Sequence, residues 1–478
     1  MKLRQSSGWH AQIRSDGDVG AGSTELSESA SGPAEPGDGH SPPPHLSLGR
    51  IRQTLHFMTR EGDVVFDARR RHGDVFGMDT LYSDLPVAVT GHPDHVRSLL
   101  TADPALAPST AGTSPLRPIV GTSSVLTATG ERHRRQRKLL MPSFHGAAIG
   151  RYREEIVAAT EREISSWPVG RPIALASAAQ SITLDVIMSG VFGVGVLAEA
   201  DEAERRLRRV VRGILQLSTS RLAKPAEVVN LARDRPIGVQ RLAMSRIDRA
   251  MYDLITQRRA AHVPGERHDV LSLLLDAEDE DARGLSDIEL RNELLTLVLA
   301  GHETTANTIA WTFERLLRAP AAYERLQDVV RSSDDPDGYL EATIHEVMRV
   351  RPVVPVIGRE VKVPWRLGEF VVPEGTRILV SILLLHHRED LYPDPFRFDP
   401  QRFVGVKPGT HTWLPFGGGI RRCLGSALAM EEMRIVVHEI ARRTDMAAPD
   451  PTPERARHRN VTMIPGRGGR VVVNALRA

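Results

Sequence analysis

The sequence has a single cysteine, a small net charge and no long apolar run, and each of these excludes a class of protein. One cysteine in 478 residues excludes an internal disulfide framework, which suits a reducing cytoplasm. A net charge of only +2 excludes the strong positive field of a general nucleic-acid binder. No apolar run approaches the roughly 18 residues of a membrane span, and the N-terminus lacks a signal-peptide core. We therefore expect a cytoplasmic protein without a transmembrane anchor.

The composition is that of a globular chain, with 41% hydrophobic and 26% charged residues. Residues 1–45 are rich in Ser, Gly, Pro, Asp and Glu, and they carry too little apolar surface to offset the entropy of ordering. We predict that they form a disordered leader. The patterns in residues 46–478 predict a single domain that is mainly α with a small β region.

The most unusual stretch runs from Trp413 to Met430 and contains the lone cysteine, Cys423. Three consecutive glycines precede it, and an amphipathic helix is expected to start at Ser426. Free N–H groups and the helix dipole favour a thiolate at such a position, so this sulfur is expected to bind a metal or act as a nucleophile. Arg421 adds a fixed positive charge suited to a carboxylate.

A second motif lies within a helix predicted over Ser286–Leu317, which would be about 45 Å long. Ser286 and Glu289 form a capping box at its start. Its middle reads Ala300-Gly301-His302-Glu303-Thr304-Thr305, a poor choice for a packed helix. Gly301 would let another group approach the backbone, and Thr304 can bond back to a carbonyl one turn earlier.

Other segments give weaker signals. A helix is predicted over Gly130–Met141, and a further helix over Tyr339–Arg349 ends in an ExxR pair. Short strands are predicted at Val75–Met78, Val87–Thr90, Phe370–Val372 and Arg377–Ser381. Near the end, Val461–Ile464 and Val471–Val473 are predicted to form a hairpin whose turn, Pro465–Gly469, reaches the substrate. The sequence contains no zinc HExxH, no GxSxG and no phosphate loop.

The pattern Phe416-x-x-Gly419-x-Arg421-x-Cys423-x-Gly425 resembles the haem-binding signature of the cytochrome P450 superfamily. The order of the other motifs over residues 46–478 is similar to that of the same family. The resemblance implies haem b (iron protoporphyrin IX), held between the long central helix and the cysteine loop, with Cys423 as the iron ligand. A thiolate ligand would favour cleavage of the O–O bond.

The resemblance also implies roles for individual residues. Glu303 and Thr304 would be the catalytic acid and alcohol that deliver protons during oxygen cleavage, whereas His302 would lie beside the catalytic face. Glu346, Arg349 and Arg402 would form a buried structural triad. The expected cofactor-binding residues, four of them near the propionates, are His133, Arg137, Gly301, Arg359, Phe416, Gly419, Arg421 and Gly425.

The implied function is a haem-thiolate monooxygenase that inserts one oxygen atom from O2 into an apolar small molecule. Hydroxylation or epoxidation is expected, with secondary metabolism as one setting, and a terpenoid, fatty acyl chain, steroid or polyketide would fit. The chain is too short for a fused reductase, so we expect a monomer served by an external ferredoxin and ferredoxin reductase. The acidic surface of that partner would then bind Arg134, Arg135 and Lys138. Segments 104–129 and 218–238 would cover the substrate.

Two alternatives stay open from the sequence. The first is a haem-thiolate isomerase or dehydratase acting on a peroxide, or a peroxide-driven hydroxylase. Such members usually lack the acid–alcohol pair found here. The second is a haem-based sensor or a carrier of hydrophobic ligands, which would not require Glu303 and Thr304.

Overall fold

The computed structural model describes residues 31–477 apart from 36–37, 40, 82–84, 145–146, 194–200, 219–232, 234 and 333. Within these residues the chain is mainly helical with small sheets, as the sequence predicts. The helices are α1 (Arg50–His72), α2 (Pro93–Thr101), α3 (Arg117–Val120), α4 (Gly130–Leu140), α5 (Ala147–Gly150), α6 (Arg153–Ser165), α7 (Leu175–Phe192), α8 (Glu202–Ser218), α10 (Gly238–Ala260), α11 (Val270–Asp276), α12 (Asp287–Leu316), α13 (Pro320–Ser332), α14 (Tyr339–Val350), α15 (Ile382–His386) and α16 (Ser426–Arg443).

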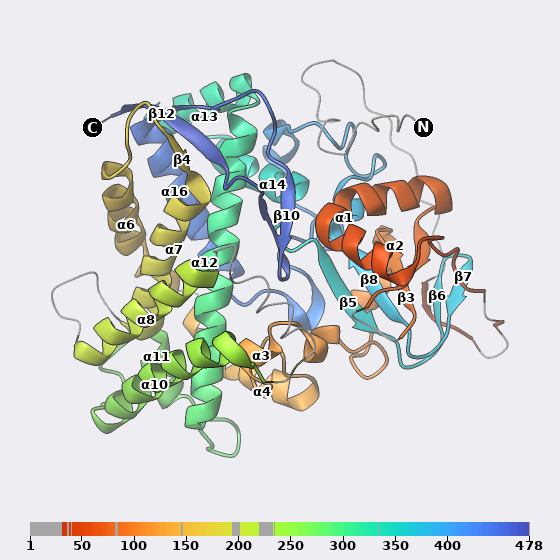
Figure 1. The fold of residues 1–478 in the computed structure, drawn as a ribbon, viewed down its shortest axis with the longest axis horizontal. Coiled ribbons are helices and arrows are strands. Elements are labelled where there is room, and N and C mark those ends of the chain that lie inside the picture. Colours follow the sequence, from red (N-terminus) through yellow and green to blue (C-terminus); the bar gives the residue numbers. More distant parts are fainter. Residues whose placement is uncertain are drawn as a thin grey trace.

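The strands are short and fall into four sheets among the described residues. They are β1 (Ser31–Pro33), β2 (Val75–Met78), β3 (Val87–Thr90), β4 (Pro172–Ala174), β5 (Val356–Glu360), β6 (Trp365–Leu367), β7 (Phe370–Val372), β8 (Arg377–Ser381), β9 (Thr444–Ala447), β10 (Ala456–Arg459), β11 (Thr462–Pro465) and β12 (Arg470–Leu476). The largest has the order β2-β3-β8-β5 and lies to one side of the helices (Figure 1).

Helix α12 is the central element and runs through the middle of the helical part (Figure 1). Its predicted capping box is present: the Ser286 hydroxyl accepts a hydrogen bond from Glu289 N, and the Glu289 carboxylate accepts one from Ser286 N. The helix packs closely along α7 and also contacts α10, α14 and α16. Because Trp311 and Phe313 are fully buried on it, α12 forms the core of the largest apolar cluster.

The described part of the predicted leader does not fit the prediction. Ser31–Pro33 pairs antiparallel with β6, and Ser41 and His45 form bridges with Val371 and Gly77. A disordered leader over residues 1–45 is therefore wrong from residue 31 onward. Residues 1–30 lie outside the described residues, as does most of the predicted lid over 218–238.

The C-terminal hairpin also differs from the prediction. Strand β11 pairs with β10, whereas β12 lies between β4 and β9 in another sheet. The true hairpin turn is therefore at Asn460 and Val461. The segment predicted as the hairpin turn, Pro465–Gly469, does turn, since Gly468 N donates to the Pro465 carbonyl over 3.0 Å, but it links β11 to a strand of another sheet. Its last residue, Gly469, packs on α12, where an added Cβ would lie 3.1 Å from the Ala310 side chain.

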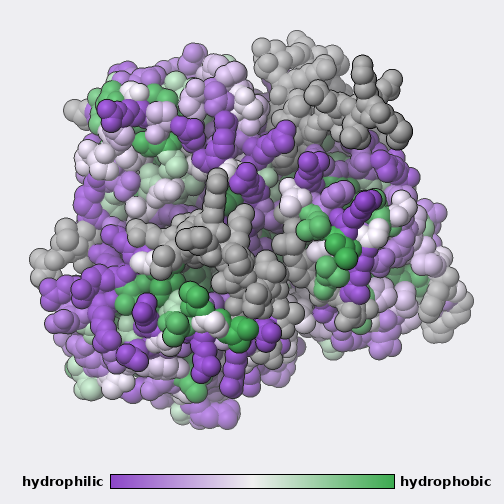
Figure 2. Space-filling model, viewed as in Figure 1, coloured by the Kyte–Doolittle hydropathy of each residue, from purple (hydrophilic) through white to green (hydrophobic). Residues whose placement is uncertain are grey.

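Helix α7 is the one described helix that is long and apolar enough to cross a membrane by these two criteria. It is mostly buried and packs against α12, α6 and α11, as the core helix of a globular protein does. On the face seen in Figure 2 polar side chains predominate, with apolar ones gathered over α1. Ile51 and Leu55 are the exposed large apolar residues of that helix.

Candidate active site

The loop before α16 holds Cys423 in a tight backbone arrangement. The Cys423 amide donates to the Phe416 carbonyl over 2.9 Å, and a 3-10 turn, Gly419–Arg421, lies between them. Gly417 and Gly419 have φ values of 64° and 62°, a region that favours glycine. A side chain on Gly419 would also collide with the Leu100 carbonyl oxygen. The loop conformation thus depends on the glycines of the motif.

The Cys423 side chain is accessible to solvent even though much protein surrounds it. Burial raises the pKa of its thiol, and the Gly425 N–H, Arg137 and Arg422 only partly oppose that rise. The Gly425 N–H at the helix start favours the thiolate, as the sequence predicts, but burial outweighs it as long as no metal is bound. A metal cation bound to the sulfur would supply the missing stabilisation, because a coordinating thiol loses its proton.

Four cationic or potentially cationic side chains lie close to one another, and one of them, Arg137, lies close to this sulfur. Burial, followed by the nearby Arg359 and Arg137, lowers the pKa of Arg421 to about 10. Burial lowers the pKa of Arg359 to about 10 as well. The pKa of buried His133 falls to about 4, first through burial and then through Arg421 and Arg137. Because these groups repel one another, a bound anion would lower the electrostatic energy of the cluster.

Their hydrogen bonds go to backbone carbonyls. Arg421 donates to Val125 and Ala128, Arg137 to Arg422 and Arg359 to Gly358. Among the described residues no carboxylate forms an ion pair with any of the three arginines. No cluster of three or more His, Cys, Asp or Glu side chains in the described chain could hold a metal alone. A planar group that brings its own metal and two carboxylates, such as haem b, fits these residues.

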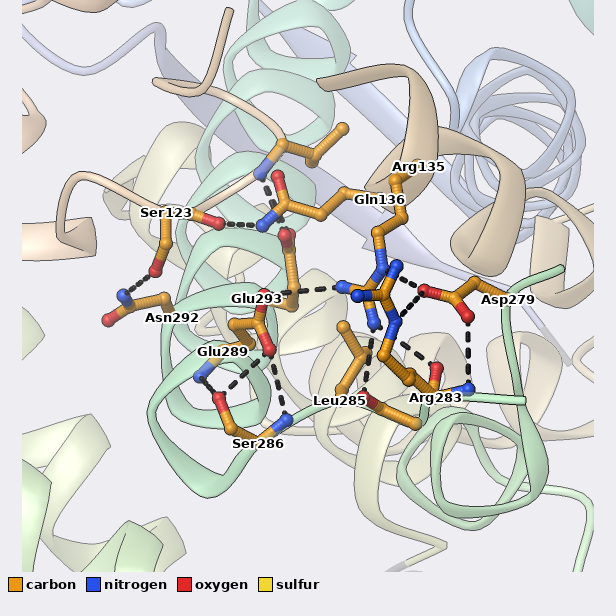
Figure 3. A network of polar contacts seen from close by, with 12 residues as sticks. Ser123, Arg135, Gln136, Asp279, Arg283, Leu285, Ser286, Glu289, Asn292 and Glu293 are labelled. Carbon is orange, nitrogen blue, oxygen red and sulfur yellow. Dashed lines mark hydrogen bonds and ion pairs between the residues drawn. The ribbon is translucent and has the colours of Figure 1, made fainter. Parts of the chain in front are cut away.

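A buried acid fixes the segment that holds Arg421. Both carboxyl oxygens of Glu293, on α12, accept from the Val125 amide at 2.8 and 3.0 Å (Figure 3). The Val125 carbonyl in turn accepts from Arg421 at 3.0 Å. Burial raises the pKa of Glu293 to about 8. Ser123, in the same segment, accepts from Asn292. Helix α12 thus connects to the cysteine loop through a single residue, Val125.

The middle of α12 carries the predicted acid and alcohol. The Thr304 hydroxyl donates to the Ala300 carbonyl over 2.7 Å, the backward bond expected from the sequence. Both Glu303 and Thr304 are partly accessible. His302 is buried instead, and its Nδ1 lies 2.8 Å from the Val298 carbonyl oxygen, which is consistent with a structural role.

Gly301 lets another group approach the helix backbone, as expected, and in the structure that group is a side chain of α7. A Cβ at this position would lie 2.8 Å from the Ile187 side chain of α7. The space that the glycine leaves is therefore filled by protein, and it permits the close packing of α7 on α12. Contact of Gly301 with the cofactor stays a prediction without support from this packing.

The predicted triad is assembled and buried. Arg349 donates to both oxygens of Glu346 at 2.7 Å, and both side chains are 0% exposed. Arg402 forms a longer ion pair with Glu346, at 3.6 Å. Arg349 also donates to the carbonyls of His386, Pro395 and Arg397. The pair thereby ties α14 to the segment that leads to the cysteine loop.

Phe416 packs against Trp413, with ring centroids 6.1 Å apart, and Gly425 is the residue before α16, with open space where a side chain would be. Sequence reasoning missed Glu293, Arg459 and Thr462. No local signal in the sequence marks the first as buried. The other two belong to a hairpin whose pairing was predicted wrongly.

The expected docking cations are already neutralised. Arg134 pairs with Glu131, and Lys138 with Glu280, each at 2.6 Å. Arg135 pairs with Asp279 at 2.6 Å, beside a surface hollow of about 640 Å³ at the start of α12 (Figure 3). The other arginines of this hollow are paired with acids as well, so it offers no free charge to an anionic ligand. That these cations meet an acidic partner stays a prediction.

Comparisons with known proteins agree with this geometry. The family model described as Cytochrome P450 matches residues 40–471. The chain is 39% identical over 403 residues to cytochrome P450 137 of Mycobacterium tuberculosis, covering 84% of this chain and 83% of that protein. It is 36% identical over 453 residues to cytochrome P450 135B1 of Mycobacterium bovis, covering 92% of each. The structure of retinoic acid bound cyanobacterial CYP120A1 matches with a TM-score of 0.75 at 23% identity, over 92% of this chain and 100% of that chain, and shows the same fold.

Proposed function

This chain belongs to the cytochrome P450 family, and we propose on that premise that it hydroxylates or epoxidises an apolar small molecule, with Cys423 as its iron ligand. Members of the family are haem-thiolate monooxygenases that use haem b, O2, a small-molecule substrate and redox partners, and this chain is such an enzyme. When bound, haem b supplies the iron at which oxygen is activated and transferred. The setting we propose is secondary metabolism.

One observation carries the assignment of the iron ligand. Cys423 is the only cysteine in the sequence, it is accessible, and it lies beside Arg137, whose charge interacts with it. His133, Arg137, Arg359 and Arg421 would hold the two propionates, because carboxylates relieve their mutual repulsion. Phe416, Gly419 and Gly425 would shape the backbone around the ligand, and Gly301 would lie near it on α12.

Glu303 and Thr304 are proposed as the catalytic pair. The Thr304 hydroxyl would orient water on the accessible side of α12, and the Glu303 carboxyl would accept a proton and pass it inward. The intact pair favours monooxygenation over the alternatives of peroxide isomerase and ligand carrier. Glu346, Arg349 and Arg402 are proposed to act structurally, by bracing the segment that precedes the cysteine loop.

The apolar substrate class is supported by the segment before Arg359. Val354, Val356 and Ile357 are only partly buried there, so an apolar ligand can contact them. Electrons are proposed to come from a separate ferredoxin and its reductase, whose acidic surface would meet the exposed Arg422 next to Cys423. We propose a cytoplasmic monomer.

The experiment that tests the proposal is spectroscopic. The purified protein is reduced and exposed to carbon monoxide, and Cys423→Ser serves as the matched variant. A thiolate-ligated spectrum in the parent and its loss in the variant are expected. An imidazole-type spectrum, or a pigment-free protein after reconstitution with haemin, would overturn the assignment of Cys423.

The substrate class has its own measurement. Terpenoids, fatty acids, steroids and polyketides are added to the ferric protein, and the Soret band reports displacement of water from the iron. No response to any apolar compound contradicts the substrate class. Product formation at full rate from peroxide alone, without reductant, would favour the peroxide-driven alternative.

A further inference from the structure

The acid of the catalytic pair contacts the C-terminal hairpin as well as α12. Oε1 of Glu303 lies 3.4 Å from Nε of Arg459, on β10, and 3.2 Å from the hydroxyl of Thr462, on β11. The Glu303 and Arg459 side chains are each 17% exposed. A carboxylate expected to relay protons is thus held by two residues that the catalytic motif does not contain.

The hairpin is built so that both partners face the same atom. Arg459 and Thr462 are directly opposite each other in the β10–β11 register and close a turn of two residues. Asn460, the first of these, has a φ of 53° and is exposed. Asparagine tolerates this left-handed conformation better than most residues. The turn therefore places solvent-exposed backbone within two residues of the groups that contact Glu303.

The Thr462 hydroxyl has one hydrogen and two acceptors within reach. They are Oε1 of Glu303, at 3.2 Å, and the carbonyl oxygen of Arg459, at 2.9 Å. With Glu303 ionised, the hydroxyl can donate to the carboxylate. With Glu303 protonated, the acid can donate to the hydroxyl oxygen, and the hydroxyl then donates to the carbonyl. Thr462 thus satisfies the acid in both protonation states, which a proton relay requires.

We propose that the turn Arg459–Thr462 is the outer part of the proton path to Glu303, with Arg459 and Thr462 as positioning residues. In each transfer a water that has taken up a proton from solvent gives that proton to Oγ1 of Thr462, while the hydroxyl proton passes to Oε1 of Glu303, and the water is left neutral. Arg459 holds the carboxylate in position through their ion pair. The other titratable group beside the acid is His302, which burial keeps neutral. This inference rests on the proposed function, because it assigns a supply route to the same acid.

Arg457 and His458 precede Arg459 on the same strand, and His458 offers a matched control. Its Nε2 pairs with Glu61 on α1, away from Glu303. His458→Gln therefore perturbs the anchoring of β10 without removing a contact of the acid. Thr462→Val removes the hydroxyl at nearly constant volume, and Thr462→Ser restores it. Arg459→Gln removes the charge, and Arg459→Lys keeps it.

The experiment measures, for each holoenzyme, the share of reducing equivalents recovered in product rather than in hydrogen peroxide, together with the solvent isotope effect on product formation. Thr462→Val is expected to lower the product rate about tenfold and to raise the isotope effect, as loss of one relay hydrogen bond would. Arg459→Gln should do the same. Thr462→Ser, Arg459→Lys and His458→Gln should retain the parent values.

A second measurement tests the contact between Glu303 and the hairpin separately from proton transfer. Hydrogen exchange of the peptide amides over residues 456–465, in each protein as purified, should rise in Thr462→Val and Glu303→Gln alike. Parent-like coupling and isotope effect in Thr462→Val would overturn the proton path, as would equal losses in His458→Gln. If the parent protein lacks the thiolate spectrum, the proposed function fails, whereas unchanged hydrogen exchange in both variants refutes the contact itself.

Discussion

The Glu346–Arg349 pair allows the sharpest test of how the site is braced. Arg349→Met removes both bonds to Glu346 and the three bonds to the carbonyls of His386, Pro395 and Arg397. Both side chains are fully buried, so water cannot take the place of the guanidinium. The variant leaves the Glu346 carboxylate inside the protein with only the longer pair to Arg402, at 3.6 Å.

The expected magnitude follows from that burial. Breaking a buried ion pair by removing one partner costs about 3–5 kcal/mol, a large share of the roughly 5–15 kcal/mol that stabilises a typical domain. Glu346→Leu should cost a similar amount, because it strands Arg349 instead. The double variant should be less destabilised than the sum of the two, with a coupling of about 1–3 kcal/mol, since neither charge is left alone.

The assay is urea denaturation of the four purified proteins, with haem content recorded in parallel. We expect haem content to fall in the single variants before any separate catalytic defect can be measured. A loss below 0.5 kcal/mol in Arg349→Met, or strict additivity in the cycle, would refute the claim that this pair holds the segment before the cysteine loop.

Three further outcomes are expected. The pKa of Glu293 is raised to about 8 in the fold against about 4.3 in an unfolded chain, so the parent loses stability as pH rises between these values. The free energy of unfolding of Glu293→Gln should therefore rise relative to that of the parent by a few kcal/mol by pH 8. A difference in urea denaturation that does not depend on pH would contradict this. Gly301→Val should lower the free energy of unfolding by about 1–3 kcal/mol, since its side chain would collide with Ile187, and an unchanged denaturation midpoint would show that α7 can move aside. Arg359→Leu should weaken haem binding about tenfold through loss of one charge-assisted contact, measured by transfer of haem to apomyoglobin, and a parent-like transfer rate would remove Arg359 from the propionate set.

The helices that carry the site could be predicted because their signals are local. A capping box and a following proline mark the ends of α12, and the glycines around Cys423 mark a backbone that other residues resist. Even the back-bonding of Thr304 follows from residue type and position alone. For these elements sequence and structure agree to within one or two residues.

What could not be predicted depends on distant partners. Glu293 contacts Val125 across 168 residues, so its burial leaves no trace in the helix around it. Strand pairing fails for the same reason: the glycines of Pro465–Gly469 are typical of a turn, whereas the actual turn has only Asn460 to mark it. The rise in the pKa of the Cys423 thiol could not be predicted either, because desolvation by burial depends on the whole fold.

The pairing of Ser31–Pro33 with β6 has a practical consequence for anyone preparing the protein. Trimming the chain at residue 45, where composition suggests a harmless cut, would strip the outermost strand from the β1-β6-β7 sheet. Trp365–Leu367 would then be an exposed edge strand with unpaired N–H and C=O groups, and such edges pair with strands from other molecules. A shortened preparation should therefore begin before Ser31 if it is to stay dispersed at high concentration.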